Sequence, residues 1–229
     1  MGKADMIEKR DLTTVARALI PFFWTQRISG YAVPDMPRFE EDGAGYFEKV
    51  VRQSSFYLEY GSGGSTVLAA RLKKRFISVD SDKYFLRAVQ RRIGTLSPGQ
   101  LLIHSNVGLN GPWGIPIFKR KTETRLLRWG KYPEAPWRAI FSNDLGLPDL
   151  IMIDGRFRVA CALTCFKYLK ESSRAIMLVD DYANRPHLQV IEDFAALEDI
   201  VGRMAVFRAK SYSEPKLKEC LSHYLSDWR

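Results

Sequence analysis

Hydrophobic residues along this chain gather in short runs that alternate with segments of helical spacing. Runs rich in apolar, β-branched and aromatic side chains predict strands buried on both faces. The predicted strands cover residues 56–60, 75–80, 101–107, 148–154 and 174–182. Between them, apolar positions recur at helical spacing, as in Phe85, Val89 and Ile93. Strands that alternate with helices predict an α/β fold with a mostly parallel sheet and helices on both faces.

The pattern is weaker at the two ends of the chain. We expect residues 1–52 to form an N-terminal helical cap around a proline-containing loop at 31–37, with its last helix near 45–51. After a helix at about 186–197, the apolar runs 200–208 and 220–228 are candidates for a final antiparallel strand pair.

Residues 108–148 show no regular pattern, and we expect a long irregular insertion there. Its tryptophans, Trp113 among them, argue against disorder. A connection of this length is usually functional, so it is a candidate wall of a binding site. A solvated loop with a few packed aromatic residues is the alternative.

A glycine-rich turn separates the strand at 56–60 from the next helix. Gly61 and Gly63 can take backbone angles that are closed to residues with a Cβ, and they let a ligand approach the main chain. The dinucleotide-binding fingerprint requires a third glycine where this chain has Thr66. A P-loop requires a lysine after the glycines, and none follows before Lys73.

The spacing Glu59-x-Gly61-x-Gly63 resembles motif I of the class I S-adenosylmethionine-dependent methyltransferases. Ser65 stands where that family often has another glycine. The resemblance covers Phe56 to the end of the chain. It implies one Rossmann-like domain over residues 1–229, with a doubly wound seven-stranded sheet and S-adenosylmethionine as cofactor.

An acid at the end of the second strand supports this resemblance. In a right-handed β-α-β unit Asp80 lies beside the glycine turn, where a carboxylate can accept hydrogen bonds from both ribose hydroxyls. Asp82 is better placed to cap the following helix. Asn106 follows the third strand, where it can bind the adenine amino group or only stabilise a turn. The predicted cofactor-binding residues are Glu59, Gly61, Ser62, Gly63, Ser65, Thr66, Asp80, Ser81, Asn106 and Val107.

Further acids follow the fourth and fifth strands. Asp154, Asp180 and Asp181 would gather with the cofactor at the carboxyl edge of the sheet. This pattern is similar to small-molecule O-methyltransferases that hold a divalent cation such as Mg²⁺, although Asp181 stands where that family has an asparagine. The three acids are therefore candidate metal ligands, and a metal-free acidic edge is the favoured alternative.

Asp154 and His187 are the predicted catalytic pair. Methyl transfer to a hydroxyl requires a group that takes its proton, and both residues follow strands of the predicted sheet. Arg156, Arg158 and Trp113 are the predicted substrate-binding residues, since arginines suit an anionic acceptor.

Length, composition and charge limit the classes of function that are open to this chain. The chain has 229 residues, 46% of them hydrophobic, which suits one large core. Its net charge of +9 keeps nucleic acid as a partner, with RNA methylation through the basic segment 115–138 as one alternative. However, the sequence after the fourth strand lacks the Asp/Asn-Pro-Pro-aromatic motif of amino-methylating nucleic-acid enzymes. We therefore rank a small acceptor first, with O-methylation favoured, and a non-catalytic nucleotide-binding module as a further alternative.

The three cysteines, Cys161, Cys165 and Cys220, show no metal-binding spacing and favour a reducing cytoplasm. The pattern predicts no membrane partner. A homodimer remains open.

Overall fold

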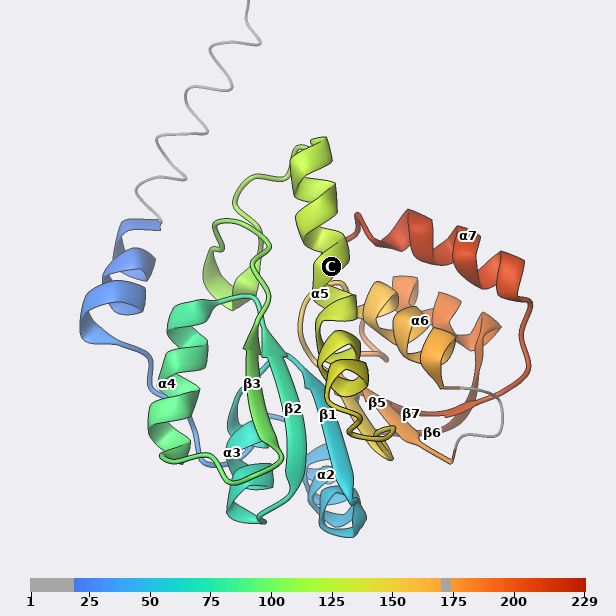
Figure 1. Ribbon diagram of the computed structural model, residues 1–229, viewed down its shortest axis with the longest axis horizontal. Helices are drawn as coiled ribbons and strands as arrows, with labels where there is room; N and C mark the ends of the chain where they lie inside the picture. Colours follow the sequence, from blue (N-terminus) through green and yellow to red (C-terminus); the bar gives the residue numbers. More distant parts are fainter. Residues whose placement is uncertain (1–18, 170–173) are drawn as a thin grey trace, which may run out of the picture.

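The computed structural model describes residues 19–169 and 174–229. Their strands form one seven-stranded sheet in the order β3-β2-β1-β4-β5-β7-β6 (Figure 1). Strands β1 to β5 pair in parallel, whereas β7 pairs antiparallel with both β5 and β6. The strands are β1 (Phe56–Tyr60), β2 (Arg75–Asp80), β3 (Gln100–His104), β4 (Leu150–Ile153), β5 (Ile176–Val179), β6 (Ala195–Val201) and β7 (Met204–Ala209). The predicted doubly wound sheet with an antiparallel C-terminal pair is confirmed.

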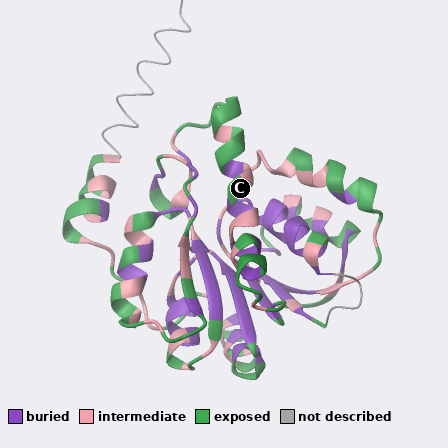
Figure 2. Ribbon diagram, in the orientation of Figure 1, coloured by how far each residue is buried: buried purple, intermediate pink, exposed green. Residues whose placement is uncertain are grey.

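Helices cover both faces of the sheet, and the central strands are buried between them (Figure 2). Alternate side chains of β1 show the two layers: Leu58 packs into the cluster formed with α5, α6 and α7, and Tyr57 packs into the cluster formed with α2 and α3. The helices are α2 (Glu41–Gln53), α3 (Gly64–Arg71), α4 (Lys83–Ile93), α5 (Glu123–Ser142), α6 (Arg158–Tyr168) and α7 (Glu214–Tyr224).

The C-terminal region differs from the prediction. The run 220–228 does not form a strand, because most of it belongs to or follows α7. In α7, Leu217, Leu221 and Tyr224 recur at the spacing of a helix and pack on the core. The strand pair is instead a hairpin of β6 and β7, turned at Gly202 with φ of 60°. The predicted helix at 186–197 is a 3₁₀ segment, η3 (Pro186–Asp193), that leads directly into β6.

The predicted irregular insertion at 108–148 is also wrong over half of its length, because it contains the 20-residue helix α5. Pro133 and Pro136 lie inside this helix and remove backbone donors, which is why the sequence pattern did not indicate it. The buried side chains of Trp129, Tyr132 and Trp137 hold it against the sheet. The approach to α5 is irregular and contains a short 3₁₀ turn, η2 (Pro112–Gly114), and residues 143–148 after the helix are irregular as well.

The N-terminal cap is seen from residue 19, and its first 18 residues lie outside the described part of the chain. Residues 19–24 are helical and continue into a π-helical turn, η1 (Thr25–Ser29). After the loop, α2 includes the helix expected near 45–51. Within residues 19–169 and 174–229, no helix is long and apolar enough to cross a membrane.

Candidate active site

The glycine turn after β1 lies against the loop after β4. Gly61 has a φ of 96°, and a Cβ there would stand 2.6 Å from the backbone nitrogen of Gly155. Gly63 differs, because a Cβ on it would meet nothing within 4 Å. The turn therefore has one side packed on the β4 loop and one side open to a ligand.

Glu59 forms the floor under this turn. Its side chain is fully buried and accepts hydrogen bonds from the hydroxyls of Ser65, Thr66 and Ser78. Burial raises the pKa of Glu59, although these hydroxyl donors lower it. Through these hydrogen bonds Glu59, Ser65 and Thr66 hold the turn in place, and their role in cofactor binding stays a prediction.

Asp80 stands at the end of β2 beside the turn, as the sequence predicts. One carboxylate oxygen accepts from the amide of Ser62 at 3.1 Å and the other from the amide of Asp82 at 2.7 Å. Burial raises the pKa of Asp80 to about 7, even though these amides lower it. The carboxylate remains partly exposed and keeps lone pairs for further donors.

Asp82 caps α4 by accepting from the amides of Tyr84 and Phe85, which confirms its predicted role. Its other oxygen accepts from Gln26 and Tyr31 at 2.8 and 2.9 Å. One aspartate thus joins the N-terminal cap to the edge of the sheet.

A cavity of about 260 Å³ opens beyond Asp80, between the loops that follow β2 and β3. Ser81 and Asn106 line it, as predicted for the cofactor. The Oδ1 atom of Asn106 accepts from the amide of Gly108 at 2.9 Å, so Asn106 stabilises a turn. Val107 belongs to the hydrophobic core, because its side chain is buried and its carbonyl accepts a hydrogen bond from Trp129.

Asn110 is a polar residue of this cavity that the sequence did not indicate. Its Nδ2 donates to the Ser81 hydroxyl at 3.1 Å, and its buried Oδ1 has no partner among the described residues. A buried acceptor without a donor is costly unless a ligand supplies one. No motif surrounds Asn110, so only its place in the fold reveals it.

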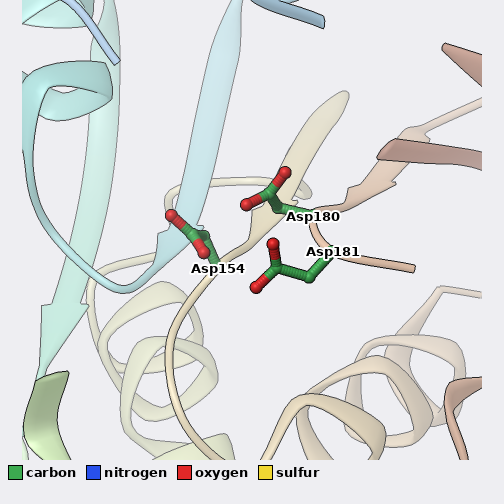
Figure 3. A group of neighbouring side chains, drawn as sticks. All are labelled: Asp154, Asp180 and Asp181. Carbon is green, nitrogen blue, oxygen red and sulfur yellow. The ribbon is translucent and has the colours of Figure 1, made fainter. Parts of the chain in front are cut away.

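The three predicted strand-end acids do come together. Figure 3 shows Asp154 after β4 and Asp180 and Asp181 after β5, and one oxygen from each lies within 4.8 Å of the others. Burial, together with the charges of Asp180 and Asp181, raises the pKa of Asp154 to about 7 against the lowering effect of Arg158.

Arginines neutralise this acidic cluster. Arg158 is 2% exposed and binds Asp154 at 2.9 Å and Asp181 at 3.0 Å. Arg203, from the β6–β7 hairpin, binds Asp180 and Asp181 at 3.2 and 3.0 Å. Arg185 also binds Asp181, at 2.7 Å. The positions of a candidate metal site are therefore already occupied by guanidinium groups.

Arg158 is not available to a substrate, which corrects its predicted role. Its five donor hydrogens are matched by five hydrogen bonds: two to carboxylates, and three to the carbonyls of Gly155, Asp180 and Asp154. A cation at the first position of α6 opposes the helix dipole, and the two carboxylates offset that cost.

Arg156, unlike Arg158, has a donor that no acceptor among the described residues matches. It forms no ion pair with the described residues, and its Nε atom is buried without a partner. Burial lowers the pKa of Arg156, and the positive charges of Arg158 and Arg185 lower it further. An anion would supply the missing acceptor.

The predicted roles of His187 and Trp113 are not supported by hydrogen bonds or by the lining of the cavity. His187 lies in η3 with its Nε2 buried and unpartnered, and burial lowers its pKa. Because Nε2 has no hydrogen-bond partner among the described residues, no bond from it to Asp154 is seen, and the pair remains a prediction. Trp113 is 79% exposed, and the cavity beyond Asp80 does not include it. Its place on the acceptor wall is not supported.

One solved structure is similar to this chain over most of its length. A methyltransferase-like protein from Silicibacter pomeroyi DSS-3 is 28% identical, with a TM-score of 0.70 over 85% of this chain and 100% of that one. The fold is that of the class I S-adenosylmethionine-dependent methyltransferases, and this likeness supports a methyltransferase that uses that cofactor.

An O-methyltransferase from Bacillus cereus in complex with SAH also matches this methyltransferase. It is 11% identical, with a TM-score of 0.43 over 92% of this chain and 93% of that one. No protein-family model and no curated protein matches the chain.

Proposed function

We propose that this methyltransferase binds S-adenosylmethionine along the edge formed by the glycine turn, Asp80 and the cavity of Asn110. Three observations fit that cofactor. Open space lies above Gly63, Asp80 offers a partly exposed carboxylate for the ribose, and the unpartnered Oδ1 of Asn110 offers an acceptor for the adenine amino group. The bound cofactor supplies an electrophilic methyl group.

We further propose that the acceptor is a small molecule with a hydroxyl group and an anionic group. The observation that carries this proposal is the arrangement of the β4 loop. Its Asp154 has a pKa of about 7 and lies beside the glycine turn, while the unpaired Arg156 follows two residues later. Asp154 takes the hydroxyl proton as the acceptor oxygen bonds to the methyl carbon and the carbon–sulfur bond breaks. Arg156 binds the anionic group.

In this proposal Arg158 positions Asp154 rather than touching the acceptor. It holds one oxygen of Asp154 through Nη2 and leaves the carboxylate partly exposed. Because arginines neutralise the charges of the acidic cluster, the cluster is stable without a divalent cation. We therefore propose methyl transfer without a metal, to be tested by comparing turnover with added Mg²⁺ and with a chelator.

The function is tested in two steps. First, S-adenosylmethionine and S-adenosylhomocysteine should raise the melting temperature in proportion to their affinity. Second, transfer of a labelled methyl group is measured with small hydroxyl compounds that do and do not carry a carboxylate or phosphate. Cofactor binding without transfer to any acceptor would support the non-catalytic alternative, and no cofactor binding would contradict the whole proposal. A cytoplasmic location and a homodimer stay predictions.

A further inference from the structure

One face of α5 carries a row of exposed cations. Arg128, Lys131 and Arg138 line a cavity of about 390 Å³ between this helix and the end of β3, together with His104, Asn106 and Ala135. We call this cavity the α5 groove. At 1.5 Å per helical residue, the row from Arg128 to Arg138 is about 15 Å long.

The positive charge of the α5 groove is not balanced locally. No carboxylate lines it, and none of its three cations forms an ion pair with the described residues. Glu134 lies on the same helix but binds Lys167 and Tyr168 instead.

The neighbouring cavity of Asn110 adds to this field. It shares His104, Asn106 and Arg128 with the groove and brings Arg27 and Lys83 to the same side of the protein. Its one acid, Asp82, is already bound by Gln26 and Tyr31 and by two backbone amides.

The α5 groove is separate from the acceptor side of the active site. Tyr132 follows Lys131 directly and is buried, with its hydroxyl against Gly155 in the β4 loop. Successive residues of a helix point about 100° apart, so Lys131 does not share the direction of Tyr132, and Asp154 and Arg156 do not line the α5 groove. A small acceptor held by Arg156 does not explain this row.

We infer that the α5 groove binds a single strand of nucleic acid through its phosphates. A row of about 15 Å spans four to five nucleotides at about 3.4 Å each, which is more than one phosphate group needs. The net charge of +9 favours the same partner. Binding here is largely independent of sequence, because Arg and Lys contact phosphates and no Phe, Tyr or Trp side chain lines the groove for base stacking.

The test uses the full chain and a fluorescently labelled single-stranded RNA of roughly a dozen nucleotides, with binding measured by anisotropy at several salt concentrations. The main variant is Lys131→Gln/Arg138→Gln, since neither residue lines the cofactor cavity. A matched control, Lys49→Gln/Lys218→Gln, removes two exposed charges on α2 and α7. Melting temperature and S-adenosylmethionine affinity are measured on each protein to confirm folding.

We expect the parent to bind RNA with an affinity that falls as salt rises. The main variant should lose about tenfold in affinity at low salt, and its salt slope should fall by about 1.4, which corresponds to two phosphate contacts. The control should retain most of the affinity and slope. Equal losses in both variants would mean general attraction to a basic protein and would overturn the inference. Binding of ADP or pyrophosphate at the groove without binding of RNA would overturn it as well. A failure here leaves cofactor binding untouched, so the proposed function is tested separately.

Discussion

Gly61 and Gly155 are in direct contact across the exits of β1 and β4. A Cβ on Gly61 would stand 2.6 Å from the Gly155 nitrogen and 2.8 Å from its Cα, distances that real side chains do not reach. This contact brings the glycine turn, which faces the cofactor site, next to Asp154. The two loops therefore form one unit, and substitutions in it should have separable effects.

Gly61→Ala should destabilise the fold, because the new methyl group collides with backbone and the φ of 96° is strained for alanine. Gly63→Ala is its matched control: its φ of 172° is ordinary extended backbone, and the methyl group points into open space. We expect Gly63→Ala to keep the parental melting temperature but to weaken S-adenosylmethionine binding. Equal melting temperatures for both variants would contradict the contact.

Asp80 should control the affinity for S-adenosylmethionine. Asp80→Ala removes a charged acceptor from the ribose and should weaken binding by about 1.5–3 kcal/mol in calorimetry. Because the pKa of Asp80 is about 7, its charged form gains population as the pH rises. The parent should therefore bind more tightly at pH 8 than at pH 6, and Asp80→Asn should lose this dependence. Unchanged affinity in Asp80→Ala would exclude the ribose contact.

Asp154 should be needed for turnover and little needed for folding. Asp154→Asn keeps an oxygen that accepts from Arg158 but removes the base, so turnover should fall by about 10²-fold or more with cofactor binding and melting temperature nearly unchanged. In the parent, turnover should rise with pH through about 7 as Asp154 loses its proton. His187→Gln serves as a comparison, because the Nε2 atom of His187 has no hydrogen-bond partner among the described residues. Full activity in Asp154→Asn would refute its role as the base.

Glu59 should show the reverse behaviour. Glu59→Gln replaces one acceptor oxygen with a donor amide beneath the turn, where three hydroxyls donate to the carboxylate. We expect a loss of about 1–3 kcal/mol of stability, which lowers the melting temperature by roughly 2–10 °C. Saturating S-adenosylmethionine should still bind. An unchanged melting temperature with lost cofactor binding would instead support direct binding of S-adenosylmethionine by Glu59.

Much of the parallel sheet can be predicted from sequence, because a buried strand and its turn are local features. The runs around Leu58, Ile77 and Ile151 are apolar on both faces, as helices on both sides require. Acids such as Asp80 and Asp154 stand directly at strand ends, and the strand ends of a parallel sheet meet at one edge. The glycine turn that carries the resemblance to class I methyltransferases is a local feature as well.

Other features depend on contacts between distant segments. Pro133 and Pro136 argue locally against a helix, yet burial of the aromatic face of α5 outweighs their cost. Arg203 reaches the acidic cluster only because β7 lies beside β5. The sequence around Arg158 suggests a cation that is free to bind a substrate. In the fold, Arg158 is buried, and its donors are bound by acceptors from the loops after β4 and β5. The sequence by itself determined which residues stand at the strand ends, whereas only the tertiary structure decided which of those charges are neutralised and which remain open to a ligand.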